Sequence, residues 1–158
     1  MAETVFIETT IPSYYVARPS RDIVQAARQQ LTIEWWTFHR PRFDIFSSQS
    51  VIAEASRGDS EMAEARLQLM ADVPLLSLDD LVGTVAQHLL DDAIIPEKAA
   101  EDAIHISCAA VHNMDYLLTW NCRHIANPQI RRRIREVLEG MGIAMPVICT
   151  PEEFVSNE

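Results

Sequence analysis

Short apolar runs alternate with longer segments of mixed polarity along this chain, and the two patterns have different periods. The short runs suit buried strands, and the longer segments repeat apolar residues at helical spacing. The expected strands are residues 4–7, 42–47, 74–76, 116–118 and 146–149. The expected helices are residues 22–39, 61–71, 78–92, 98–113 and 128–139, with shorter ones after Pro12 and Ser48. This alternation predicts a three-layer α/β domain with a mainly parallel sheet of about five strands.

The segment around residues 98–113 is rich in alanine, which lets a neighbouring element approach closely, so we expect a central helix packed on the sheet. Asp102 lies at the edge of its apolar arc on a helical wheel. The strand that follows, Tyr116–Leu118, ends in Thr119, Trp120 and Asn121. A carboxylate is therefore expected near a polar strand end.

Other acids occupy comparable positions. Glu8 follows the first strand, and Glu54 lies in the short helix after the second. Because parallel strands bring their carboxyl ends to one edge of a sheet, Glu8, Glu54, Asp102 and Asn121 can converge there. Mg²⁺ and Mn²⁺ prefer oxygen ligands of this kind. Each acid also has a simpler explanation, as a solvated helix carboxylate or a cap near a helix start, so the joint pattern carries the hypothesis.

Composition narrows the class of protein. The chain has 158 residues, 48% of them hydrophobic, and a formal net charge of -10. That length suits one domain, residues 1–158, with fraying expected only over the last few residues, Ser156–Glu158. The negative charge argues against bulk electrostatic binding of nucleic acid, although a bound cation can supply positive charge locally. Three cysteines without CxxC spacing and no long apolar segment favour a cytoplasmic protein that does not enter a membrane.

Longer stretches resemble a known family. FIETTIPSYY, SVIAEASRGD, EKAAEDAIHISCAAVHNMDYLLTWNCRHIAN and PVICTPEEF are similar to the PIN domain, in the branch of VapC-type toxin ribonucleases. The resemblance covers nearly the whole chain. It implies a Rossmann-like α/β/α fold, an acidic site for Mg²⁺ or Mn²⁺, and hydrolysis of RNA phosphodiester bonds by metal-activated water.

The resemblance assigns catalytic and metal-binding roles to Glu8, Glu54, Asp102 and Asn121. Two of these positions depart from the family pattern. The family's first acid is normally an aspartate, so Glu8 is one methylene longer, and Asn121 is an amide where the family has a fourth acid. These departures motivate a second hypothesis, in which the chain is a weak or inactive PIN scaffold that serves as an interaction module.

Residues beside the four candidate ligands receive supporting roles. Thr9, Thr119 and His105 are expected to orient the ligands, although a structural role is the simpler explanation for His105. Trp120 is expected to stack on a base at the rim, with Arg123 and Arg131 contacting phosphate. The alternative for the arginines is a solvated helix face.

The expected partners are an RNA substrate, an antitoxin protein docking on helices of the N-terminal half such as the Trp35–Trp36 surface, and a second copy in a homodimer. A phosphatase-like α/β domain is a weaker hypothesis, since no DxDx motif follows the first strand. Only four glycines occur, and no Gly-rich phosphate loop is among them.

Overall fold

The computed structural model describes residues 1–154, and five parallel strands form the centre of the fold. The strands are β1 (Thr4–Ile7), β2 (Asp44–Ser48), β3 (Leu75–Leu76), β4 (Tyr116–Leu118) and β5 (Val147–Cys149). They lie in the order β3-β2-β1-β4-β5, and each neighbouring pair is parallel. The strand order reverses direction between β1 and β4, which is the place where open parallel sheets bind ligands.

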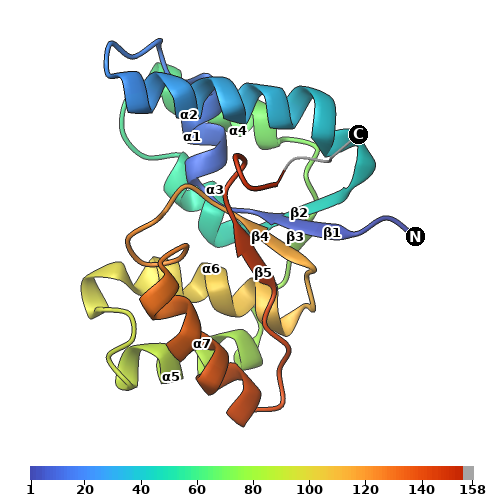
Figure 1. The fold of residues 1–158 in the computed structure, drawn as a ribbon, viewed down its shortest axis with the longest axis vertical. Coiled ribbons are helices and arrows are strands. Elements are labelled where there is room, and N and C mark those ends of the chain that lie inside the picture. Colours follow the sequence, from blue (N-terminus) through green and yellow to red (C-terminus); the bar gives the residue numbers. More distant parts are fainter. Residues whose placement is uncertain (155–158) are drawn as a thin grey trace.

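Helices cover both faces of this sheet (Figure 1). One layer holds α1 (Thr10–Val16), α2 (Ile23–Glu34) and α4 (Ser60–Met70), with the short α3 (Gln49–Ala55) near the sheet edge. The other layer holds α5 (Asp80–Asp91), α6 (Ala100–Val111) and α7 (Pro128–Gly140). The three-layer α/β/α fold expected from the sequence is therefore confirmed. The expected fraying of Ser156–Glu158 lies outside the described residues.

The central helix α6 is buried along most of its length. Its buried residues are Ala103, His105, Ile106, Ser107, Cys108, Ala109 and Ala110. The small side chains allow the helix to pack closely between the sheet and α5, as its composition predicts. A short 3-10 turn, Glu97–Ala99, precedes it and places Asp102 in the first turn of α6.

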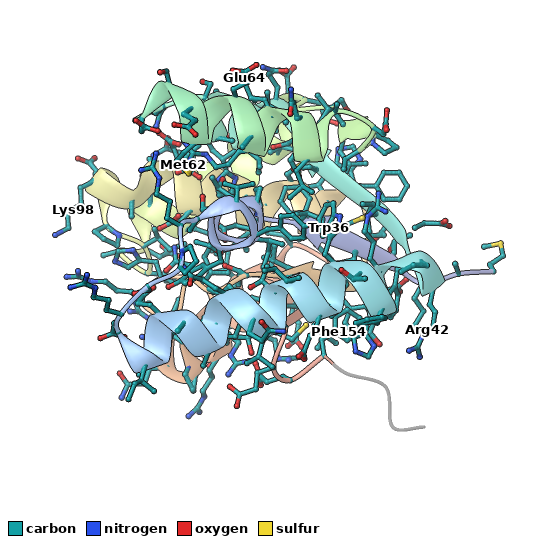
Figure 2. All side chains as sticks on the ribbon, turned by 90° about the horizontal axis from the view of Figure 1, so that it is seen from above. Trp36, Arg42, Met62, Glu64, Lys98 and Phe154 are labelled. Carbon is teal, nitrogen blue, oxygen red and sulfur yellow. The ribbon has the colours of Figure 1, made fainter. Side chains whose placement is uncertain are left out.

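The long helix expected over residues 22–39 ends earlier than predicted. The α-helix stops at Glu34 and a π-helical turn, Trp35–His39, follows it. The wider turn rotates the side chains, so that Trp35 and Trp36 are both buried while Phe38 is exposed. Figure 2 shows Trp36 inside the molecule, whereas Glu64 and Lys98 point outward. The Trp35–Trp36 docking surface expected from the sequence is therefore wrong, because neither ring is available to a partner.

Candidate active site

Glu8 is a buried acid at the strand reversal. Its side chain is only 2% exposed, and its Oε1 accepts three hydrogen bonds. Thr10 donates two of them, from its backbone N–H at 3.1 Å and its hydroxyl at 2.5 Å, and the Thr119 hydroxyl donates the third at 2.6 Å. Burial raises the pKa of Glu8 above its ordinary 4.5, although these bonds and the charge of His105 act in the opposite direction. The fold thus holds a carboxyl group in one orientation at the end of β1.

Glu54 reaches the same place from α3, and His105 reaches it from α6. The His105 Nε2 lies 3.1 Å from Glu54 Oε1, and the ring is fully buried. Burial acts to raise the pKa of Glu54, but the bond to His105 and the Thr9 hydroxyl outweigh it and lower that pKa to about 2. For His105 burial acts to lower the pKa, and the carboxylates of Glu54, Glu8 and Asp102 raise it overall. The ion pair therefore favours the charged forms of both groups.

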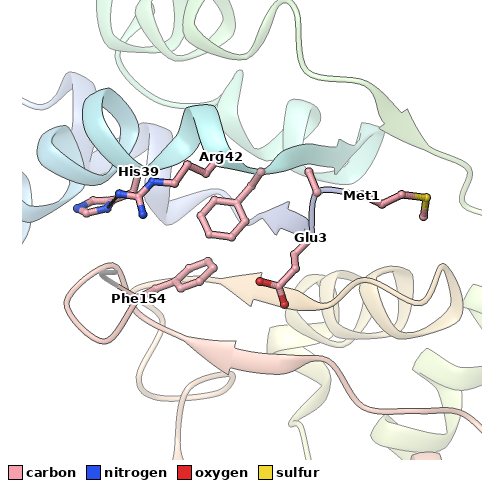
Figure 3. Close-up of a pocket in the computed structure, with 7 residues that line it drawn as sticks. Met1, Glu3, His39, Arg42 and Phe154 are labelled. Carbon is pink, nitrogen blue, oxygen red and sulfur yellow. Dashed lines mark hydrogen bonds between the residues drawn. The ribbon is translucent and has the colours of Figure 1, made fainter. Parts of the chain in front are cut away.

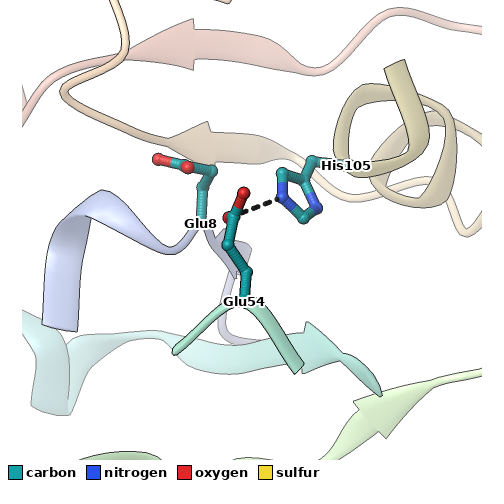
Figure 4. Close-up of side chains that lie close together, drawn as sticks. All are labelled: Glu8, Glu54 and His105. Atoms are coloured by element: carbon teal, nitrogen blue, oxygen red, sulfur yellow. Dashed lines mark hydrogen bonds and ion pairs between the residues drawn. The ribbon is translucent and has the colours of Figure 1, made fainter. Parts of the chain in front are cut away.

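Glu8, Glu54 and His105 form one compact group. Each offers a ligand atom, and these atoms all lie within 4.8 Å of one another. Figure 4 shows the Glu54 side chain rising between Glu8 and His105, each on a different element. Two carboxylates and one imidazole at the end of a parallel sheet are a donor set that fits a divalent cation. Of the predicted ligands, the structure therefore brings Glu8 and Glu54 together.

Asp102 lies beside this group but pairs with a different residue. Its Oδ2 is 3.2 Å from the Nδ1 of His124, and both side chains are mostly buried. Asp102 and Glu54 nevertheless line one cavity of about 320 Å³, and Lys98, Ala99, Glu101, Arg123 and His124 complete its wall. Asp102, the predicted third acid, thus faces the same cavity as Glu54, and the His124 ring contacts one of its two carboxylate oxygens.

Asn121 has a structural role that the sequence did not indicate. Its Oδ1 accepts the backbone N–H groups of Arg123 at 3.3 Å and His124 at 3.0 Å. Its own N–H donates to the Thr119 hydroxyl at 2.9 Å. The amide oxygen expected to bind metal is therefore directed to the backbone of the loop, because that loop would otherwise leave two N–H groups unpaired.

One of the two threonines expected to orient the ligands, Thr119, bonds a ligand directly. Thr119 donates to Glu8 as described, whereas within residues 1–154 the buried Thr9 hydroxyl has no hydrogen-bond partner. Thr10, which follows Thr9 in the chain, holds Glu8 through two hydrogen bonds and was not predicted from the sequence. Its position at the start of α1 was the available indication, since hydroxyl residues there commonly bond nearby polar groups.

The residues expected to bind RNA fall in different surroundings. Trp120 is only 5% exposed, its Nε1 donates to the Thr32 hydroxyl at 2.7 Å, and Arg28 lies over its ring. Stacking on a base needs a free ring face, so the expectation for Trp120 is corrected to a core contact. Arg131 donates to the Ile148 carbonyl at 3.0 Å and ties α7 to β5. Arg123 lines the cavity that Glu54 and Asp102 share.

His124 and Lys98 complete the cavity and were not singled out by sequence reasoning. His124 follows Asn121 by three positions, so the loop that closes on the Asn121 amide also delivers this imidazole to Asp102. The close spacing of Asn121, Arg123 and His124 was the available indication in the sequence.

A second cavity lies at the opposite edge of the sheet. It has a volume of about 440 Å³ and is lined by Met1, Ala2, Glu3, His39, Arg42, Phe43 and Phe154. Figure 3 shows Glu3 and Phe154 facing this space near the amino end of β1. Parallel sheets bind ligands at the carboxyl ends of their strands, so the Glu8 side of the sheet is the better candidate.

Comparison with known proteins gives a structural likeness and no sequence match. No protein-family model and no curated protein matches the sequence. The fold is similar to a crystal structure of VapBC2 from Rickettsia felis bound to a DNA fragment from their promoter. The two chains are 15% identical, the alignment covers 93% of this chain and 98% of that chain, and the TM-score is 0.51. Together with the five-stranded parallel sheet, this likeness shows that the chain shares the α/β/α fold of that chain.

Proposed function

We propose that the protein is an endoribonuclease that uses Mg²⁺ or Mn²⁺ to hydrolyse RNA phosphodiester bonds in the cytoplasm. The observation that carries this proposal is the close group of Glu8, Glu54 and His105 at the reversal of the strand order. Buried charges in proteins are paired with one another or bind metals, and a phosphodiester needs its negative charge offset before water can attack it.

Glu8 and Glu54 would hold the cation, with Asp102 facing it from the same cavity as Glu54. When bound, the cation supplies an activated water and offsets charge on the phosphoryl oxygens. The protein supplies fixed orientation. Thr119 and Thr10 hold the Glu8 carboxyl, and His105 holds that of Glu54.

Arg123 lines the same cavity and would meet a phosphate of the RNA. Hydrolysis then joins a water oxygen to phosphorus and releases the adjoining ribose oxygen, which leaves with a proton.

A toxin role with an antitoxin partner is the biological setting we propose. The similar structure is of a VapBC2 complex, and here α2 exposes Ile23 and Val24 beside Ala27 and Leu31, which line a shallow cavity. Exposed apolar side chains of this kind are common where a protein partner docks. A homodimer through the same helix is the alternative occupant of that surface.

One observation favours a second function, an inactive scaffold that binds a partner. The His124 ring contacts the Asp102 carboxylate, and the Asn121 side-chain oxygen accepts a backbone N–H. Two of the four positions expected to bind metal therefore have other partners. A scaffold needs no more than the fold and an exposed surface.

Cleavage of labelled RNA distinguishes the two functions. We expect cleavage that requires Mn²⁺ or Mg²⁺, and a loss of at least about 100-fold in Asp102→Asn and in Glu54→Gln. Asp80→Asn and Glu61→Gln, which change exposed acids on other helices, are the matched controls. Absence of cleavage in the wild type, together with no rise in melting temperature on adding either cation, would favour the scaffold.

A further inference from the structure

We propose that His105 is itself a ligand of the cation, so that the site prefers Mn²⁺ to Mg²⁺. This inference rests on the proposed metal-dependent function and decides between the two cations it names. It also changes the role of His105 from orienting Glu54 to binding the metal directly.

The geometry places one nitrogen of His105 among the carboxylates. Its Nε2 lies 3.1 Å from Glu54 Oε1, and a nitrogen of the ring lies within 4.8 Å of a Glu8 oxygen. Figure 4 shows this nitrogen facing Glu54, while the other ring nitrogen faces away. Within residues 1–154, the buried Nδ1 has no hydrogen-bond partner. Nε2 is thus the nitrogen through which the ring engages the site.

The burial of the ring fixes that nitrogen in place. His105 is fully buried, and its ring packs against Phe6 of β1 with 6.4 Å between ring centres. A side chain held in this way loses little conformational entropy when it binds a cation. The two carboxylates are also close to each other, so a divalent cation among the three groups would offset their mutual repulsion better than one imidazole proton.

Glu8 is well suited to such a mixed site. All three of its described hydrogen bonds go to Oε1, and its second oxygen, Oε2, takes none of them. The third acid, Asp102, is in contact with His124, so the imidazole of His105 takes the place in the compact group that a third carboxylate was expected to fill.

The nitrogen donor determines which cation is preferred. Mg²⁺ is a hard cation that favours oxygen ligands and near-ideal octahedral geometry. First-row transition cations bind imidazole well, and among N/O sites their affinities begin at Mn²⁺ and rise along the series. Two carboxylates with one imidazole should therefore bind Mn²⁺ more tightly than Mg²⁺.

Calorimetric titration with Mn²⁺ and Mg²⁺ provides the first test. We expect wild-type protein to bind Mn²⁺ at least about tenfold more tightly than Mg²⁺, and His105→Gln to reduce this ratio to within about threefold. His112→Gln is the matched control, because His112 caps the C-terminal end of the same helix and its Nε2 bonds the Ser77 carbonyl. If His105 merely orients Glu54, both affinities will fall together and the ratio will stay unchanged, which overturns the proposal.

Pulsed electron paramagnetic resonance of the Mn²⁺-loaded protein provides the second test. A directly bound imidazole gives nitrogen modulation that changes when the histidines carry ¹⁵N, and the wild type suffices for this comparison if His105→Gln fails to fold. We expect the modulation to vanish in His105→Gln and persist in His124→Gln.

The remaining outcomes distinguish a failure of the ligand role of His105 from a failure of the proposed function. Bound Mn²⁺ without histidine nitrogen, or with nitrogen that disappears only in His124→Gln, would overturn the ligand role and leave the proposed function standing. Failure of the wild type to bind either cation would remove the proposed function as well.

Discussion

The charge of Glu54 stabilises the folded protein, and this contribution depends on pH. Its folded-state pKa of about 2 lies below its ordinary 4.5, so the unfolded chain binds a proton more readily than the folded protein. A depressed carboxyl pKa gives stability that is fully present above the unfolded value, near pH 4.5, and is lost as pH falls through the folded value. The pH window for the effect of Glu54 is therefore about 2 to 4.5.

We expect Glu54→Gln to destabilise the protein by about 1–2 kcal/mol at pH 7, after allowing for solvent screening of a partly exposed group. The difference from wild type should shrink by roughly half at pH 3. Urea unfolding at both pH values measures it. Glu61→Gln is the control, since Glu61 is exposed and pairs with Arg18 at the surface. A pH-independent difference would mean that packing around residue 54, rather than its charge, is what the substitution removes.

Substitutions at Asn121 test whether this position can bind the cation, because the resembled family has an acid here. Asn121→Asp retains the oxygen that accepts the N–H groups of Arg123 and His124, so we expect unchanged stability and no gain in Mn²⁺ affinity. Asn121→Ala removes both bonds and should cost about 1–2 kcal/mol. Melting curves and calorimetric titration provide the measurements. A clear rise in Mn²⁺ affinity for Asn121→Asp would return this position to the metal site.

At the scale of elements, one buried hydrogen bond joins α2 to the end of β4. The Trp120 Nε1 donates to Thr32 at 2.7 Å, and Thr32 in turn donates to the Arg28 carbonyl at 2.6 Å. Thr32→Val keeps the side-chain shape and leaves the indole N–H without a partner, which should cost about 1–3 kcal/mol. Thr37→Val, at an exposed position beyond α2, is the control in urea unfolding.

The same variant tests the corrected role of Trp120. Because the ring is a core contact, Thr32→Val should leave the affinity for RNA within about twofold of wild type. Weaker RNA binding at unchanged stability would instead indicate that the ring serves the substrate.

The strands were predictable because they are short, apolar and flanked by polar residues. β1 and β4 were predicted to the residue, and β2 was displaced by a residue or two where Arg42 and Phe43 form a turn and an extended link. The end of α2 was not predictable, because a helical wheel assumes a constant period and the π-helical turn at Trp35–His39 changes it.

The candidate site was likewise predictable from the sequence only in part. Glu8 and Glu54 follow neighbouring strands, and topology alone brings them together. The partners of Asp102 and Asn121 depend on how the loop after β4 folds back, and that loop is shaped by backbone hydrogen bonds with no periodic pattern in the sequence. His105 was expected to assist the ligands, and the sequence did not indicate how deeply its ring is buried.

At the scale of the whole molecule, charge constrains how RNA can bind. The chain carries a formal net charge of -10, and three arginines of α7 already have partners within the fold. Arg131 bonds the Ile148 carbonyl, Arg133 bonds the Asp92 carbonyl, and Arg132 pairs with Glu136. Binding of RNA should therefore depend on the cation site and a small number of basic side chains.

No helix in residues 1–154 is long and apolar enough to cross a membrane.

This arrangement predicts a shallow salt dependence. With Mn²⁺ present and cleavage blocked by Asp102→Asn, the slope of log affinity for single-stranded RNA against log salt should be about -1 to -2, as for two or so phosphate contacts. Arg123→Ala should make the slope shallower by about 0.7, because Arg123 lines the acidic cavity. Arg132→Ala should leave it unchanged, since that side chain is exposed and paired on the outer face of α7. Fluorescence anisotropy across a salt series measures all three slopes. A slope of several units for Asp102→Asn without further substitution would reveal an extended basic surface and contradict a cavity-centred mode of binding.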